Sequence, residues 1–318
     1  MKIGILDAKT LGPDIDLSPI NACGDVVVYD LTHPEEIQER IKDLDVVLTN
    51  KVILNESNLS NTHNLKFIGL FATGYNNIDI EYAKSRGIAV ANVAGYSTNS
   101  VAQHTFAMLL YLMENLGAYD ASVKNREYEK SDTFTFIAHP FYELSGKVLG
   151  IIGLGTIGLK VAKIAEAFDM KVIYYSTTGK NNNKVYERVS LNELLQLSDV
   201  VSIHAPYNKH THNLIGYDQL KQMKPSSYLV NVGRGNIVNE ADLTKALNEK
   251  LIAGAALDVL SAEPIHTDNP LYDVQDKNKL LITPHIAWAS IEARRLLVDE
   301  IVKNIKAFQK GDLRNRVV

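Results

Sequence analysis

The sequence contains a single cysteine, Cys23, among 318 residues, so no intramolecular disulfide can form. This scarcity is typical of a protein that works in a reducing compartment. Basic residues are not in excess either, because 33 Lys and Arg stand against 37 Asp and Glu and the net charge is −4. No stripe of positive charge marks a nucleic-acid-binding surface. We therefore expect no nucleic-acid partner.

Long hydrophobic runs are also missing. The stretch from Gly87 to Met113 has no charged residue, but Asn92, Gln103 and His104 interrupt it, so it does not resemble a membrane span. The first ten residues become a strand too early for a signal peptide. No charge run, repeat or low-complexity linker divides the chain. We expect a soluble cytoplasmic protein with no membrane association, large enough for two α/β domains.

The most informative motif is a glycine-rich turn after a β-like run. Residues 148–152 lead into Gly153, Gly155 and Gly158, which form a GxGxxG pattern. Gly153 permits a tight turn, Gly155 lets the backbone approach a pyrophosphate, and Gly158 lets the next helix pack on its strand. That helix directs its N-terminal N–H groups at the phosphates. Because a second strand follows at 171–175, the pattern predicts a dinucleotide site, with a purely structural turn as the alternative.

The end of that second strand bears on the choice of cofactor. An acidic residue there would bind the ribose 2′-hydroxyl and favour NAD. Ser176 stands at this position instead, followed by Thr177, Thr178 and Lys180. Hydroxyls and an ammonium group can accept a 2′-phosphate, although a solvated loop explains them equally well. We therefore expect use of NADP, or of both NAD and NADP.

Short apolar strands alternate with helix-like segments along the whole chain, which predicts parallel sheets covered by helices. The expected strands of the first third are 3–6, 26–29, 46–49, 67–70 and 88–93. Those after the glycine turn are 171–175, 200–204, 228–232, 253–257 and 280–283, which with 148–152 make a six-stranded doubly wound sheet. The first block has no GxGxxG, so we expect it to be a smaller domain that supplies the other wall of a cleft.

Three further stretches have less regular patterns. Residues 98–116 predict a helix that is apolar on nearly every face from Phe106 to Met113, and such a helix has to be buried in a core or a subunit interface. The stretch 117–142 has no clear period and predicts an arm or an irregular crossing. The loop 71–79 is rich in small residues and can offer backbone N–H groups to a carboxylate, with an ordinary connection as the alternative.

Three polar side chains follow the last strands, at the sheet edge where open α/β sheets bind ligands. They are Arg234, Glu263 and His285. Singly, they are also explained as a surface arginine, a solvated carboxylate and a hydrogen-bonded core histidine. Together, beside a dinucleotide site, they form a set that can reduce a carbonyl group.

With these motifs in order, the chain resembles the D-isomer-specific 2-hydroxyacid dehydrogenase family, most closely its glycerate dehydrogenase and hydroxypyruvate reductase branch. The resemblance runs nearly end to end, through ATGYNNID at 72–79, GLGTIG at 153–158, VGRG at 232–235, Asp258-Val259 with Glu263-Pro264, and PHIAW at 284–288. It implies a Rossmann nucleotide domain, residues 100–286, inserted into a flavodoxin-like substrate domain, residues 1–99 plus 287–318.

The resemblance also implies roles for single residues. Arg234, Glu263 and His285 are the implied catalytic residues. His285 would protonate the 2-keto oxygen, Glu263 would orient it and favour its charged form, and Arg234 would polarise the carbonyl. The implied cofactor-binding residues are Gly153, Gly155, Thr156, Ile157, Gly158, Ser176, Thr177, Ala205, Pro206, Thr211, Val232 and Asp258. The implied substrate-binding residues are Asn50, Thr73, Gly74, Arg234, His285 and Trp288.

The implied activity is NAD(P)-dependent interconversion of a small 2-keto acid and its D-2-hydroxy acid, such as hydroxypyruvate or glyoxylate and D-glycerate or glycolate. The implied assembly is a homodimer that uses the helix 101–116. No metal site is expected, because no cysteine or carboxylate cluster accompanies His210 and His212. Two alternatives stay open, a phosphoglycerate-type dehydrogenase and a non-catalytic NAD(H)-sensing protein similar to related corepressors.

Overall fold

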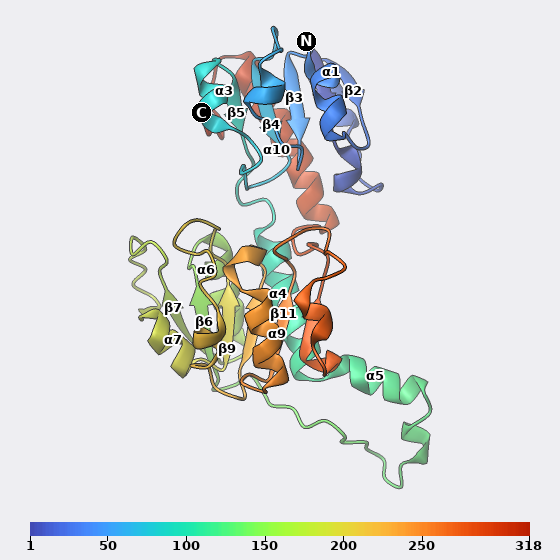
Figure 1. The fold of residues 1–318 in the computed structure, drawn as a ribbon, viewed down its shortest axis with the longest axis vertical. Helices are drawn as coiled ribbons and strands as arrows, with labels where there is room; N and C mark the ends of the chain where they lie inside the picture. The colour runs from blue at the N-terminus through green and yellow to red at the C-terminus, as the bar shows by residue number, and fades with distance from the viewer. The chain divides into compact units, whose positions relative to one another are not determined.

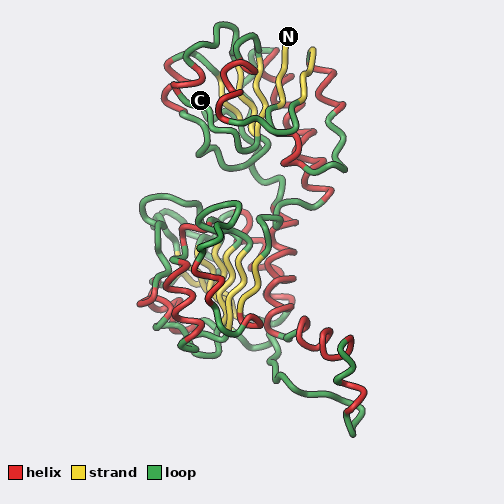
Figure 2. Tube along the Cα trace, turned by 45° about the vertical axis from the view of Figure 1, so that its right-hand side comes forward, coloured by secondary structure: helices red, strands yellow, loops and turns green.

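The computed structural model describes residues 1–318 as two compact units. Unit 1 comprises Met1–Ser97 and Ala289–Val318, and unit 2 comprises Thr98–Trp288. Both chain termini belong to unit 1 (Figure 1). In each unit the strands form one layer that helices cover (Figure 2). A bilayer span would need a longer or more apolar helix than any that this chain forms.

Unit 1 is built on a five-stranded parallel sheet of order β2-β1-β3-β4-β5. Its strands are β1 Lys2–Ile5, β2 Asp25–Val28, β3 Val46–Thr49, β4 Phe67–Leu70 and β5 Ala89–Ala91. Its helices are α1 Ile37–Ile41, α2 Glu56–Leu59, α3 Ile80–Ser85 and α10 Ile291–Gln309. Every residue of β3 and β4 is buried, because helices cover both faces of a parallel sheet. The strand order is the flavodoxin-like one that the resemblance implied.

Unit 2 contains a seven-stranded parallel sheet of order β12-β11-β10-β9-β6-β7-β8. Its strands are β6 Val148–Ile152, β7 Lys171–Tyr175, β8 Glu187–Arg188, β9 Val200–Ile203, β10 Tyr228–Asn231, β11 Gly254–Leu257 and β12 Leu280–Ile282. Its helices are α4 Thr98–Met113, α5 Leu116–Lys124, α6 Thr156–Ala167, α7 Leu191–Leu197, α8 Tyr217–Leu220 and α9 Glu240–Asn248. The chain order reverses between β6 and β9. The carboxyl ends of these two strands are therefore the switch point at which doubly wound sheets bind ligands.

The two faces of the unit 2 sheet bury separate apolar clusters. Ile151 points to the face that α4 and α6 cover, whereas its neighbour Ile152 points to the face that α7 and α9 cover. This alternation follows from the two-residue period of a strand. The two helix layers hold the sheet rigid, so the loops at its carboxyl edge start from well-fixed positions.

Two predictions about unit 2 were wrong in detail. The sheet has seven strands rather than six, because the two-residue strand β8 pairs in parallel with β7 and is too short and polar to be recognised in the sequence. The long helix ends at Met113, and Asn115 takes a left-handed conformation, φ 54°, before α5 begins. Within the single chain α4 is buried on most of its surface, and Ala107 and Tyr111 are exposed, so the core of unit 2 does not cover the whole helix.

The segment from 116 to 143 is the arm that its irregular sequence predicts. Helix α5 and a 3₁₀ turn at Tyr128–Lys130 carry the chain away from the sheet, and an extended strip returns it to Leu144 (Figure 1). Several apolar side chains of this arm face solvent, among them Phe134 and Ile137, which are 91% and 78% exposed.

Candidate active site

The glycine-rich turn between β6 and α6 leaves room for a ligand at the switch point. Gly153 has φ +94°, and a Cβ there would come within 2.8 Å of the backbone of Ala205, so no other residue fits. A Cβ on Gly158 would lie 2.5 Å from the Gly153 carbonyl oxygen. A Cβ on Gly155 would meet nothing within 4 Å, so the space above the first turn of α6 is open. This cradle of free helix N–H groups fits a pyrophosphate.

Other residues implied to bind the cofactor line the same edge of the sheet. Ala205 follows β9 and touches Gly153, and Val232 follows β10. Thr211 is buried and its Oγ1 donates to the Pro206 carbonyl at 2.8 Å, which holds the loop after β9 in place. Thr156 opens helix α6, and Ile157 packs against the core on the α4 side of the sheet.

The loop after β7 is tied both to itself and to the glycine-rich turn. The Gly179 N–H donates to the Ser176 carbonyl, which closes a turn around Thr177. Ser176 is buried, and its Oγ accepts the Asn181 N–H at 3.3 Å. The Asn181 Nδ2 donates to the Leu154 carbonyl at 2.6 Å. The side chain at the expected ribose position is therefore held against the dinucleotide turn.

Glu263 and His285, which are 22 residues apart, meet in the folded chain. The His285 Nδ1 lies 2.6 Å from a Glu263 carboxylate oxygen, and both side chains are partly exposed. His285 follows β12 with φ +56°, a left-handed conformation that is uncommon for a residue with a side chain. Such strain persists only where the surroundings hold it, and it is concentrated at functional sites.

Asp258 holds the backbone on both sides of His285. The His285 N–H donates to the Asp258 carbonyl, and the Asp258 carboxylate, which is 1% exposed, accepts the N–H groups of Ile286 and Ala287, both at 2.9 Å. The loop that carries the histidine is thus fastened to the end of β11.

Two side chains that the sequence analysis did not select complete this anchor. The Thr283 Oγ1 donates to the Asp258 Oδ1 at 2.6 Å, and the His104 Nε2 of helix α4 lies 3.1 Å from that hydroxyl and 3.5 Å from the carboxylate. Burial raises the pKa of Asp258, but the hydrogen bonds from His104, Thr283 and the loop backbone outweigh it and hold the pKa below its usual value. Asp258 is therefore a buried anion.

Arg234 stands on a turn that a buried asparagine shapes. The Asn231 side chain accepts the Gly233 N–H and donates to the Arg234 carbonyl, both at 3.0 Å. A Cβ on Gly235 would lie 1.9 Å from the Leu260 carbonyl carbon, so this turn is pressed against the loop that leads to Glu263. The structure thereby brings the turn that bears Arg234 beside the loop that bears Glu263.

A second buried carboxylate fixes the Glu263 loop. Glu240, the first residue of α9, is 7% exposed and accepts the Ser261 N–H at 2.6 Å, the Ser261 hydroxyl at 2.7 Å and the Asn269 amide at 2.7 Å. The Leu260 N–H in turn donates to the Glu263 carboxylate at 2.9 Å. Sequence reasoning missed Glu240, because an acidic residue in the first turn of a helix is ordinary there.

The remaining implied substrate residues lie in unit 1, with the exception of Trp288. Asn50 follows β3, is buried, and donates through Nδ2 to the Thr10 hydroxyl at 3.1 Å. Thr73 lies in the loop after β4 and donates to the Val93 carbonyl at 2.8 Å, with Gly74 next to it. Both loops lie at the carboxyl edge of their sheet. Trp288, in unit 2, is half-buried and packs against the core on the α4 side.

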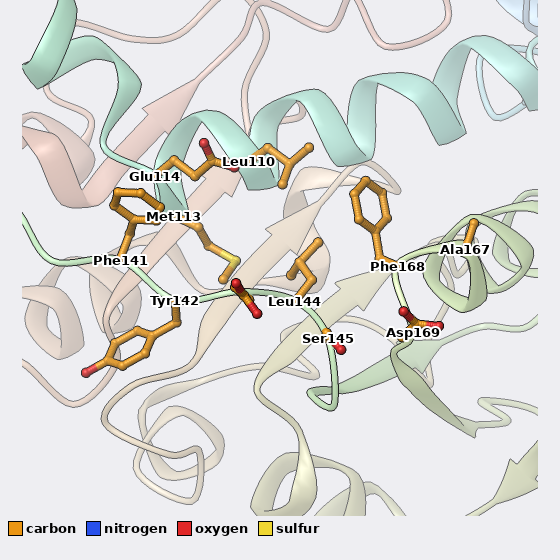
Figure 3. Close-up of a pocket in the computed structure, with 11 residues that line it drawn as sticks. Leu110, Met113, Glu114, Phe141, Tyr142, Leu144, Ser145, Ala167, Phe168 and Asp169 are labelled. Atoms are coloured by element: carbon orange, nitrogen blue, oxygen red, sulfur yellow. The ribbon is translucent and has the colours of Figure 1, made fainter.

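A hollow of about 390 Å³ lies elsewhere in unit 2, at the root of the arm (Figure 3). Leu110 and Met113 of α4, Phe141 and Leu144 of the returning strip, and Phe168 give it an apolar wall. None of its lining residues belongs to the site that the sequence predicts, and none comes from the carboxyl edge of the sheet. This hollow is therefore separate from the predicted site.

Comparisons with known proteins give similarity to dehydrogenases that use a dinucleotide, in agreement with the glycine-rich turn. A profile described as D-isomer specific 2-hydroxyacid dehydrogenase, NAD binding domain, matches residues 106–287, which lie within unit 2. The chain is 40% identical over 318 residues to a hydroxypyruvate reductase from Blautia hydrogenotrophica, with 98% of each chain covered. It is 37% identical over 317 residues to a glycerate dehydrogenase from Methylorubrum extorquens, with 99% of this chain and 98% of that one covered.

A solved structure extends the similarity to three dimensions. The acyclic imino acid reductase Bsp5, in complex with NADPH and D-Arg, is 30% identical, and each chain is covered over 100% of its length. The TM-score is 0.89. The two-unit architecture is therefore shared with a protein that holds a dinucleotide.

Proposed function

Because the chain belongs to the D-isomer-specific 2-hydroxyacid dehydrogenase family, we propose that its substrates are hydroxypyruvate and glyoxylate, which it reduces to D-glycerate and glycolate. The coarser activity follows from the family: the protein is an oxidoreductase that interconverts 2-keto and 2-hydroxy acids with a nicotinamide cofactor. The observation that carries the acid–base part of the proposal is the 2.6 Å contact between Glu263 and His285 at the carboxyl edge of the sheet, and the choice of substrates rests on the similarity to a hydroxypyruvate reductase and a glycerate dehydrogenase.

In this proposal the proton chemistry belongs to His285. A nicotinamide bound in unit 2 would supply the hydride for reduction and would accept one in oxidation. His285 donates a proton from its Nε2 to the 2-keto oxygen, and it takes that proton back in the reverse direction. Glu263, on the Nδ1 side, keeps the ring oriented and favours its charged form. His285 has a positive φ, and its N–H donates to the Asp258 carbonyl, which fixes the backbone that carries the ring.

Arg234 is assigned the electrostatic part of the reaction. Its planar guanidinium can polarise the carbonyl and pair with the substrate carboxylate through two hydrogen bonds. The bond from its Nη1 to the Gly233 carbonyl, at 2.8 Å, leaves other N–H groups of the fork for a substrate. We assign Asn50, Thr73 and Gly74 of unit 1 to the substrate, together with Trp288, and unit 2 to the cofactor.

A substrate panel tests this function. Hydroxypyruvate, glyoxylate, pyruvate and phosphohydroxypyruvate are each offered with NADH and with NADPH, and oxidation of the cofactor is followed by absorbance. We expect the highest kcat/KM for hydroxypyruvate or glyoxylate. A clear preference for phosphohydroxypyruvate would favour the phosphoglycerate-type alternative. No turnover of any keto acid, with cofactor binding intact, would favour the non-catalytic alternative.

We further propose that NADPH is used at least comparably to NADH. The support is the absence of a carboxylate at Ser176 and the hydroxyls of Thr177 and Thr178 beside it. Ser176→Asp should place a charge that accepts the ribose hydroxyls of NADH and repels a 2′-phosphate. The ratio of kcat/KM for the two cofactors should move toward NADH by about tenfold or more. A strong NADH preference in the wild type that the variant leaves unchanged would contradict the assignment of Ser176.

The assembly we propose is a homodimer built on α4 and the arm. The support is the outer face of α4, where Tyr111 is 45% exposed, and the apolar side chains that the arm leaves in solvent. The hollow at the root of the arm offers an apolar seat for side chains of a second copy (Figure 3).

A further inference from the structure

We propose that Arg188 is the side chain that recognises the 2′-phosphate of NADP(H). This inference rests on the proposed use of NADPH and names the residue responsible for it. The loop 176–180 contains no arginine, so a bidentate phosphate ligand is not evident from the sequence there. The tertiary structure supplies one from farther along the chain.

The pairing of β8 with β7 brings Arg188 to the cofactor edge of the sheet. Tyr174 and Arg188 are partners in the parallel register, so Arg188 lies beside the last residues of β7, just before Ser176. Its Nη1 donates to the Gly179 carbonyl at 3.0 Å and to the Asn181 carbonyl at 3.5 Å. The guanidinium therefore lies directly against the loop in which Ser176 accepts the Asn181 N–H.

The Gly179 carbonyl is the nearer of the two acceptors that hold the guanidinium. Gly179 has φ +70°, and a Cβ there would lie 3.6 Å from the Arg188 Nη2. A guanidinium has five N–H donors, and the two carbonyl contacts use those of Nη1. The donors of Nη2 and Nε are left for other acceptors, and Arg188 as a whole is exposed. A fork held in this way loses little further freedom when it binds a phosphate.

The charge of the loop favours the same ligand. Residues 176–186 include Lys180 and Lys184 and no Asp or Glu. The acidic neighbour Glu187 is engaged with Lys171 of β7, at 3.7 Å. A 2′-phosphate carries close to two negative charges and three acceptor oxygens, which a guanidinium fork matches better than an isolated ammonium group.

A purely structural role for Arg188 has a different consequence. If the guanidinium only fastened the loop carbonyls, its loss would loosen the ribose site for both cofactors equally. If it binds the 2′-phosphate, its loss weakens NADPH and leaves NADH nearly unchanged. The ratio of the two dissociation constants therefore separates the roles.

The experiment measures binding directly by calorimetry, without turnover. NADPH, NADH and the fragments 2′,5′-ADP and 5′-AMP are titrated into wild type, Arg188→Ala and Arg188→Lys, with Lys184→Ala as the matched control that removes a charge from the same loop. We expect Arg188→Ala to weaken NADPH and 2′,5′-ADP by about tenfold or more and NADH and 5′-AMP by less than about twofold. Arg188→Lys should fall between, because it keeps the charge and loses the fork. Lys184→Ala should weaken NADPH by much less than Arg188→Ala does, because an ammonium group binds phosphate only as a point charge.

Unchanged NADPH affinity in Arg188→Ala, or an equal loss for both cofactors, would overturn the role of Arg188. Should the alanine variant fail to fold, the lysine variant decides by the same ratio. Wild type that binds NADH but neither NADPH nor 2′,5′-ADP would overturn the NADPH proposal itself, and with it this inference. Reduction of hydroxypyruvate with NADH tests the proposed reaction separately, since it does not depend on the 2′-phosphate.

Discussion

At the scale of single residues, the backbone at His285 decides how the proposed acid and its partner meet. The left-handed φ of this residue and the hydrogen bond from its N–H to Asp258 turn the ring toward Glu263. Asp258 is buried, and Glu263, although partly exposed, is held by the Leu260 N–H that it accepts. The geometry is therefore set before a substrate arrives.

Removing the imidazole should separate chemistry from binding. In His285→Ala we expect kcat for keto-acid reduction to fall roughly 100- to 10,000-fold, the usual contribution of a positioned proton donor. The dissociation constant of NADH should stay nearly unchanged, because the glycine-rich turn is intact. Steady-state kinetics and direct cofactor titration measure the two quantities, and near-normal turnover would exclude His285 as the acid.

His204 illustrates a different use of histidine, in the packing of the sheet. It follows β9, its Nε2 lies 2.8 Å from the Ser202 hydroxyl, and its Nδ1 is buried without a hydrogen-bond partner. Burial lowers the pKa of His204 to about 3. In the unfolded chain the histidine pKa is near the usual value of about 6.5. Above about pH 6.5 the histidine is neutral in both the folded and the unfolded chain, so it does not lower the free energy of unfolding. As the pH falls from about 6.5 toward 3, only the unfolded chain takes up the proton, and the free energy of unfolding decreases.

This difference predicts a specific acid sensitivity. Below about pH 6.5 the unfolded chain takes up a proton that the folded chain refuses, so the free energy of unfolding should drop by up to about 1.4 kcal/mol per pH unit from this group alone. His204→Gln has no such proton, and its stability should decline less steeply. Urea denaturation at pH 7.5, 6 and 5 compares the slopes. Parallel slopes would show that the histidine is solvated in the folded protein.

At the scale of elements, the candidate site in unit 2 is a set of loops at the carboxyl edge of the sheet, each fastened by a buried polar side chain. Asn231 shapes the turn after β10, Asp258 fastens the loop after β12, and Glu240 fastens the loop after β11. The sheet itself is rigid because both faces are covered. Loop positions therefore depend on a few hydrogen bonds whose loss should be measurable.

Glu240 offers the clearest test at this scale. Glu240→Ala leaves the N–H and hydroxyl of Ser261 and the amide of Asn269 without their acceptor, which should cost about 2–4 kcal/mol of unfolding free energy. Because the loop also carries Glu263, kcat should fall while NADH affinity is retained. The matched control is Glu56→Ala, which removes an exposed glutamate from the same first position of another helix, α2, and should change neither. Wild-type kcat in Glu240→Ala would show that the loop holds its place without this anchor.

At the scale of the whole molecule, the arm is notable because its apolar side chains are exposed to solvent in the single chain. Burying the side chains of Phe134 and Ile137 away from water would lower the free energy of the protein. A symmetric pair of chains is the commonest way to bury such a surface. We expect light scattering at micromolar concentration to give twice the chain mass of 35.3 kDa. Phe134→Asp combined with Ile137→Asp should shift the mass toward the monomer.

The control for this prediction lies in unit 1. Leu313 is 83% exposed and lies outside the arm, so Leu313→Asp should leave the mass unchanged. A monomeric wild type would refute the dimer, and a dimer that survives both arm substitutions would place the interface elsewhere on the chain.

Local sequence was sufficient for the features that depend on local chemistry. Buried parallel strands need apolar residues on both faces, so eleven of the twelve strands could be recognised from short apolar runs. The turn at Gly153 needs a residue without a side chain, so its glycines are visible as a motif. Arg234, Glu263 and His285 could be selected because each follows a recognisable strand and matches a motif of the family.

The rest depended on contacts between residues far apart in the chain. Strand β8 and Arg188, the anchors Glu240 and Thr283, and the break that ends α4 at Met113 have no distinctive local pattern. Their roles arise from which backbone groups and side chains they meet after the sheet has assembled. The sequence alone therefore determined the sheets, the glycine-rich turn and the choice of site residues. Only the tertiary structure decided what holds those residues in place and which arginine lies against the loop after β7, because hydrogen bonds between distant segments exist only in the folded chain.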